Sequence, residues 1–70
     1  MTNTIQLRTY IEDQGVKLGH VANVLGISSN TLRKKLNNEQ EFKVSEAEQL
    51  SALLRLTRDE RDDCFFGPVH

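Results

Sequence analysis

Chain breakers divide this sequence into short segments, and the apolar residues of each segment recur at helical spacing. Single glycines lie at positions 15 and 26, an Asn-Asn pair lies at 37–38, and a Gly-Pro pair lies at 67–68. Glycine and asparagine adopt the left-handed conformation that ends helices, and proline cannot continue one. No segment shows the sustained polar–apolar alternation of a strand. The pattern therefore predicts an all-α fold, a compact bundle of five short helices.

The chain has 70 residues, which is enough for one small domain, because two separate cores would each fall below the size that folds unaided. We therefore treat 1–70 as a single domain. Apolar residues make up 37% of the chain, which is too many for a disordered tail. No apolar run approaches the length that spans a bilayer, so we expect no membrane partner and a cytoplasmic location.

Caps and apolar spacing predict where the helices begin and end. Asn3, Ser28 and Thr57 each place a side-chain oxygen where it can accept hydrogen bonds from the first free N–H groups of a helix. The predicted helices span 4–14, 18–25, 29–36 and 44–54, with a fifth in the C-terminal region 57–70.

The start of the fourth helix has two predicted forms. In one, Ser45 and Glu48 form a capping box; in the other, Phe42 packs against Ala47 as a hydrophobic staple. The sequence does not choose between them.

Charge is unevenly distributed along the chain. The formal net charge is −1, yet residues 17–36 carry four lysine and arginine residues and no acid. Residues 37–49 carry the opposite excess, with four glutamates against Lys43. Because a local basic surface and not the net charge decides whether a domain binds nucleic acid, the segment 17–36 is the candidate contact surface.

The same segment, about 17–36, has the outline of a helix-turn-helix. Ala22 is small where the two helices would approach most closely, and Gly26 permits the tight turn between them. The core beneath the second helix is predicted to consist of Leu18, Val21, Ile27 and Leu32. The polar and basic face of that helix would then be free to enter the major groove of DNA.

The stretch Leu18-Gly-His-Val-Ala-Asn-Val-Leu-Gly-Ile-Ser-Ser-Asn-Thr-Leu-Arg-Lys-Lys-Leu-Asn resembles the helix-turn-helix of the Cro and lambda-repressor-like family. The flanking helices are similar to those of small phage and prophage regulators, so the resemblance covers residues 4–66. It implies a Cro-like transcriptional repressor that occupies an operator and excludes polymerase. Two positions differ from the family pattern. Relatives often carry a phosphate-binding glutamine in the place of Leu18. They also often carry an apolar residue in the place of Lys35, whereas in this chain the leucine comes one position later, at Leu36.

A helix in the major groove meets base edges with its N-terminal turns, and flanking residues hold the phosphates. The predicted base-contacting residues are Ser28, Ser29, Asn30, Arg33 and Lys34. The predicted phosphate-contacting residues are Lys17, His20, Lys35, Asn37, Asn38 and Lys43.

A single reading helix binds weakly, so a homodimer on a two-fold symmetric double-stranded operator is expected. Phe65 and Phe66 cannot both face one core, which predicts a self-association surface made of Cys64, Phe66 and Val69. Phe66 could instead fold back onto the first or fourth helix.

No catalytic constellation is evident, and we expect no enzymatic activity, no cofactor, no small-molecule ligand and no metal. The only cysteine, Cys64, is expected to be a small buried apolar side chain beside Phe65. The alternative function is a protein-interaction module, antitoxin-like or an accessory adaptor, that keeps the helix-turn-helix core and binds its partner through the fourth and fifth helices.

Overall fold

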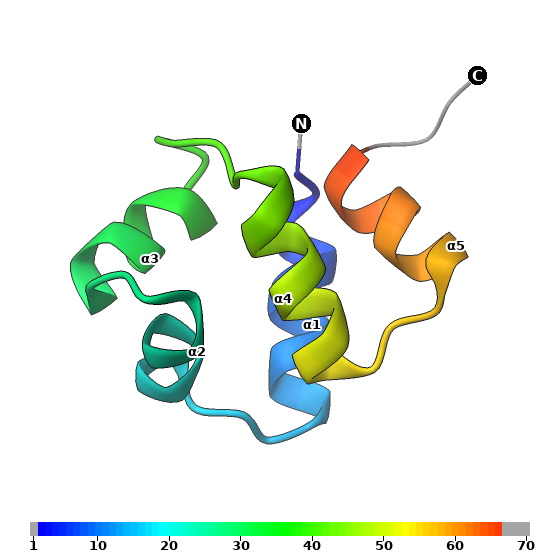
Figure 1. The fold of residues 1–70 in the computed structure, drawn as a ribbon, viewed down its shortest axis with the longest axis horizontal. Helices are drawn as coiled ribbons and strands as arrows, with labels where there is room; N and C mark the ends of the chain where they lie inside the picture. Colours follow the sequence, from blue (N-terminus) through cyan, green and yellow to red (C-terminus); the bar gives the residue numbers. More distant parts are fainter. Residues whose placement is uncertain (1, 67–70) are drawn as a thin grey trace.

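The computed structural model describes residues 2–66, which form five α-helices and contain no strand. The helices are α1 (Thr4–Asp13), α2 (Leu18–Leu25), α3 (Ser29–Leu36), α4 (Val44–Leu54) and α5 (Arg58–Arg61), and a π-helical turn, η1 (Asp62–Phe66), continues α5 (Figure 1). The predicted all-α bundle of five short helices is confirmed.

The first and last helices begin at their predicted caps. The side chain of Asn3 accepts a hydrogen bond from the backbone N–H of Gln6 at 3.1 Å. Thr57 and Glu60 cap α5 reciprocally, because the side chain of each accepts a hydrogen bond from the backbone N–H of the other. These bonds satisfy N–H groups that have no partner within the helix.

The start of α4 has the spacing of the second predicted form and excludes the first. Lys43 is the N-cap, so Phe42 precedes the cap and Ala47 is the fourth helical residue, which is the spacing of a staple. The backbone N–H of Lys43 donates to a carboxylate oxygen of Glu46 at 2.8 Å. The capping box that begins at Ser45 does not form, because Ser45 already lies inside the helix.

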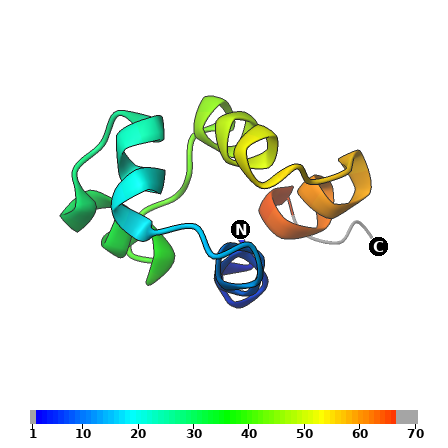
Figure 2. The same ribbon diagram turned by 90° about the horizontal axis from the view of Figure 1, so that it is seen from below.

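The helices are arranged so that α2 and α3 lie at one end of the molecule and α5 with η1 at the other (Figures 1 and 2). α1 and α4 lie between the two ends, and α2 packs against both α3 and α4. A hydrogen bond from the side chain of Gln14 to the carbonyl of Leu54 joins the C-terminal ends of α1 and α4. The α2–α3 pair is therefore carried on the central helices.

One apolar core joins the elements, and every helix except α5 contributes to it. Its buried residues are Leu7, Ile11, Val21, Ala22, Leu25, Leu32, Leu36, Ala47, Leu50, Leu54, Cys64 and Phe65. Burial of this apolar surface is the main favourable term in folding, so the core fixes how the α2–α3 pair is presented to solvent.

The predicted self-association surface is wrong at Cys64. This side chain is fully buried, and the carbonyl of Cys64 accepts a hydrogen bond from the backbone N–H of Asn3 at 2.6 Å. Phe65 is also buried, whereas Phe66 is 47% exposed and does not fold back into the core. Val69 lies outside the described residues. The prediction that Cys64 is a buried apolar side chain beside Phe65 is confirmed.

Burial also predicts that the thiol of Cys64 is unreactive. Removal from water raises the pKa of Cys64 to about 11, so the nucleophilic thiolate is scarce at neutral pH. We expect alkylation of the native protein by iodoacetamide at neutral pH to be slow, and to become rapid in urea. The rate is followed by mass spectrometry, and equal rates in both conditions would contradict the burial of this side chain.

Candidate nucleic-acid interface

The position of α3 is set by the turn that precedes it. Gly26 ends α2 in the left-handed conformation with φ of 69°, which favours glycine. The backbone N–H of Ile27 then donates to the carbonyl of Ala22 at 3.0 Å. Leu32 and Leu36 on the inner side of α3 are 1% and 2% exposed. The opposite side of α3 is thereby directed to solvent.

Lys35 is buried, and its predicted contact with DNA phosphate is wrong. The residue is 5% exposed, and its ammonium nitrogen lies 2.9 Å from a carboxylate oxygen of Glu46 and 3.0 Å from the carbonyl of Glu41. Lys35 therefore lies on the inner side of α3, and Leu36 is buried as well. The ion pair attaches the C-terminal half of α3 to the first turn of α4.

Phe42 completes this attachment. The ammonium of Lys35 lies 5.7 Å from the centroid of the Phe42 ring, a cation–π distance. The same ring meets Phe65 edge to face, with centroids 5.8 Å apart. A continuous set of contacts thus runs from α3 through the α3–α4 loop to η1.

The ion pair makes stability depend on pH. Burial by itself raises the pKa of Glu46, but hydrogen bonds from Lys35 and from the N–H of Lys43, with the charges of both lysines, lower it below the ordinary value of 4.5. The folded state thus binds this proton more weakly than the unfolded chain. The stabilisation that the ionised Glu46 contributes is complete above pH 4.5 and is lost as the pH falls through the pKa of Glu46 in the folded state.

We expect Glu46→Gln to flatten the acid side of the stability profile, since glutamine does not titrate. Urea unfolding at a series of pH values below neutrality measures this. Glu48→Gln is the matched control, because Glu48 is exposed on the same helix and should keep the wild-type profile. An unchanged acid limb in Glu46→Gln would contradict the role given to this carboxylate.

Four of the five predicted base-contacting residues form one free row on α3. Ser29, Asn30, Arg33 and Lys34 are exposed. Within residues 2–66, the side chains of Asn30, Arg33 and Lys34 have no hydrogen-bond or ion-pair partner. No carboxylate in the described part of the chain neutralises Arg33 or Lys34, so the donors of the row are available to an external ligand.

Ser28 is exposed, but its hydroxyl is engaged in the cap of α3. The oxygen accepts a hydrogen bond from the backbone N–H of Thr31 at 3.1 Å, and the hydroxyl lies 2.9 Å from the hydroxyl of Thr31. The structure thus brings Ser28 to the same end of α3 as Ser29 and gives it a structural role.

Apart from Lys35, the predicted phosphate-contacting residues fall into two groups. Lys17, His20 and Lys43 have exposed side chains, and Lys17 and Lys43 are the N-caps of α2 and α4. The side chains of Asn37 and Asn38 are exposed but each makes a contact to α1. Asn37 accepts from Arg8 at 3.0 Å and Asn38 donates to Thr4 at 3.3 Å.

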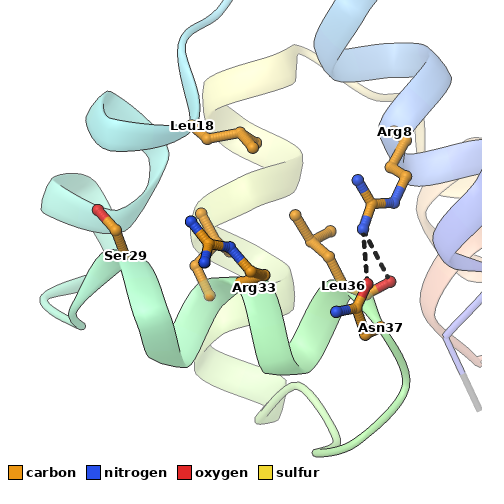
Figure 3. A pocket seen from close by; sticks show the side chains of 7 residues that line it. Arg8, Leu18, Ser29, Arg33, Leu36 and Asn37 are labelled. Carbon is orange, nitrogen blue, oxygen red and sulfur yellow. Dashed lines mark hydrogen bonds between the residues drawn. The ribbon is translucent and has the colours of Figure 1, made fainter.

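Sequence reasoning placed Leu18 in the core, and this is wrong. The side chain is 45% exposed and lines a surface hollow of about 270 Å³ between α1, α2 and α3. Leu18 is the first residue of α2, which explains why it reaches past the packed part of the helix. Figure 3 shows Leu18 directed into the hollow across from Leu36.

Arg8 lines the same hollow and was missed from the sequence. Its guanidinium donates to the side chain of Asn37 at 3.0 Å and, at 3.5 Å, to the carbonyl of Leu36, so it reaches from α1 to the end of α3 (Figure 3). Arg33 lies on the opposite side of the hollow. The only signal in the sequence was that Arg8 is the single cationic side chain before Lys17.

No protein-family model, curated protein or solved structure matches this chain. The interface is therefore interpreted from its own geometry. In residues 2–66 no helix is long and apolar enough to cross a membrane. In the same range, no three His, Cys, Asp or Glu side chains are grouped so that they could hold a metal ion.

Proposed function

We propose that this protein is a sequence-specific DNA-binding regulator of transcription that reads the major groove with α3. The observation that carries the proposal is the free row on α3. Its side chains, Ser29, Asn30, Arg33 and Lys34, are exposed and have no acidic partner within residues 2–66, while Leu32 and Lys35 hold the other side of the helix in place. An exposed helix of this kind, anchored on its inner side, fits the groove.

Each side chain of the row has a distinct capacity toward DNA. The two parallel donors of Arg33 suit O6 and N7 of guanine, and the amide of Asn30 suits N6 and N7 of adenine. Ser29 can contact either kind of base, and Lys34 suits phosphate or a base edge. Lys17, His20 and Lys43 would hold the backbone of the flanking DNA and set the register.

The distribution of charge supports this orientation. α5 and η1 together carry four acidic residues against Arg58 and Arg61, a net charge of −2, at the end of the molecule opposite α3 (Figure 1). On this balance DNA would be attracted to the end that carries Arg33 and Lys34 more than to the end that carries α5. The resemblance to Cro-like regulators supports repression by occupation of an operator, with no cofactor required.

The test is selection of bound duplexes from a random pool. We expect one sequence to be enriched, with two-fold symmetric half-sites about one helical turn apart. Contacts from Lys17, Lys34 and Lys43 would give each protomer a slope of about −3 in log affinity against log salt concentration. A pool that stays random, with binding that is weak and indifferent to sequence, would contradict the proposal.

The second candidate is a protein-interaction module, and exposed apolar side chains on α1, α4 and η1 favour it. Ile5, Val44 and Phe66 are 79%, 62% and 47% exposed. Such side chains are typical of surfaces that another protein covers. A failed DNA selection, together with a stable complex that Phe66→Asp abolishes, would favour this function.

A dimer on DNA predicts a specific effect of Phe66. If this side chain belongs to the self-association surface, wild-type protein should sediment with a mass that rises with concentration, and Phe66→Asp should sediment as a monomer. Arg58→Asp, a second exposed position in the same C-terminal region, is the control and should behave as wild type. If the wild-type protein sediments as a monomer at every concentration, Phe66 does not belong to a dimer surface.

A further inference from the structure

The hollow between α1, α2 and α3 has features of a ligand site that the contacts within the described chain do not use. Its volume of about 270 Å³ lies just below the usual range for small-molecule pockets, so it suits a small ligand. Leu18 provides the exposed apolar surface, the buried Leu32 and Leu36 lie at the floor of the hollow, and two arginine side chains flank the three leucines (Figure 3). This combination selects for a molecule that is both apolar and anionic.

Arg8 is the better placed of the two arginines to hold an anion. Its guanidinium is kept in position by Asn37 and the carbonyl of Leu36, yet these bonds use only one of its terminal nitrogens. The remaining N–H groups are free to donate to a carboxylate or phosphate. Within residues 2–66 no ion pair neutralises Arg8 or Arg33, so both cations remain available.

Leu18 is the exposed apolar side chain of the hollow. Leu18 is 45% exposed although it lies beside the buried Leu32 and Leu36. An alkyl chain laid against Leu18 would remove this surface from water, which is favourable in proportion to the apolar area covered.

A neighbouring hollow sets the direction of the ligand. It measures about 120 Å³, shares Arg8 and Leu18 with the first, and contains Glu12. The negative charge of the Glu12 carboxylate would repel an anionic ligand placed in this neighbouring hollow. An anionic head on Arg8 would therefore extend its apolar chain toward α3, over Leu36 and Leu32.

We infer that this hollow binds a small organic anion with an apolar chain, of the fatty-acid class. The anionic head pairs with Arg8, with Arg33 as the second cation of the site, and the chain lies on Leu18, Leu32 and Leu36. Ser29 and Arg33 line the hollow and also belong to the proposed DNA-reading row, so the ligand and DNA would compete. This competition rests on the proposed function, whereas binding of the ligand does not.

The test uses octanoate as the probe, below its micelle-forming concentration, and protein with labelled methyl groups in the absence of DNA. We expect saturable shifts of the Leu18, Leu32 and Leu36 methyl resonances. Octanol lacks the charge and acetate lacks the chain, so each should bind at least about tenfold more weakly than octanoate. Shifts that are confined to other methyl groups, or equal affinities for octanol and octanoate, would overturn the inference.

Variants test the two parts of the site separately. Arg8→Gln should weaken octanoate binding about tenfold and leave octanol binding unchanged, whereas Leu18→Ser should weaken both. Arg58→Gln, at the far end of the molecule, is the matched control and should bind octanoate as the wild type does. Unchanged octanoate binding in folded Arg8→Gln would overturn the assignment of the head group.

A competition experiment separates this inference from the proposed function. Octanoate should raise the dissociation constant for the selected duplex in wild-type protein, and the effect should be smaller in Arg8→Gln. If octanoate binds the hollow but no duplex is selected, the proposed function fails and the ligand site stands. If a duplex is selected but octanoate leaves the methyl resonances unmoved, the ligand site fails alone.

Discussion

Glu46→Ala is expected to lower the free energy of unfolding by about 3 kcal/mol, because it leaves the ammonium of Lys35 buried without its counter-charge. It also removes the acceptor of the N–H of Lys43 at the start of α4. For a domain this small the total stability is roughly 3–5 kcal/mol, so the variant should retain only about 0–2 kcal/mol, and between about 3% and 50% of it should be unfolded without denaturant. Urea unfolding followed by far-ultraviolet circular dichroism measures the loss.

Two further variants distinguish the effect of breaking the ion pair from the effect of replacing a glutamate in a helix. Glu48→Ala removes an exposed glutamate from the same helix and should change stability by less than about 0.5 kcal/mol. The double variant Lys35→Met, Glu46→Leu replaces both charges by apolar groups and should recover most of the loss. If the double variant were no more stable than Glu46→Ala, the instability would have another origin than the unpaired ammonium.

Arg33→Ala is expected to weaken binding to the selected duplex by about 1–3 kcal/mol for each half-site, a factor of roughly 5 to 150. The reason is the loss of two parallel donors that have no other partner in the described part of the protein. Stability should hardly change, because Arg33 is exposed. Fluorescence anisotropy with labelled duplex measures the affinity of each variant.

Arg58→Ala is the control for the change in net charge. Arg58 lies in α5, away from the proposed interface, so its loss should leave the affinity close to that of the wild type. Arg33→Ala should also lower discrimination between the selected duplex and one with a changed guanine. Equal losses of affinity in Arg33→Ala and Arg58→Ala would mean that DNA binding depends only on the net charge of the protein and not on the position of Arg33.

Local signals predicted the helices well. The bounds of α2, α3 and α4 agree with the sequence prediction. Gly26 ends α2 and Ser28 caps α3 through contacts with residues close by in the chain. The exposed row on α3 also followed from local spacing, because one face of a short amphipathic helix is determined by its own sequence.

Side chains whose environment depends on distant residues were placed wrongly. Lys35 was assigned to phosphate as a surface lysine, but Glu46, which is remote in the sequence, makes its burial possible. Leu18 fitted an apolar stripe, yet the start of α2 leaves it half exposed beside Arg8. Neither the ion pair nor the hollow has a local pattern, because each arises only when α3 packs against α4 or α1.

The most direct test of base reading by α3 combines a protein change with a base change. Each guanine of the selected half-site is replaced in turn by 7-deazaguanine, which lacks the N7 acceptor, and affinity is measured for wild-type protein and Arg33→Ala. We predict one position at which the replacement weakens wild-type binding and has almost no effect on the variant. The same penalty in both proteins at every guanine would contradict the central claim that Arg33 reads a base in the major groove.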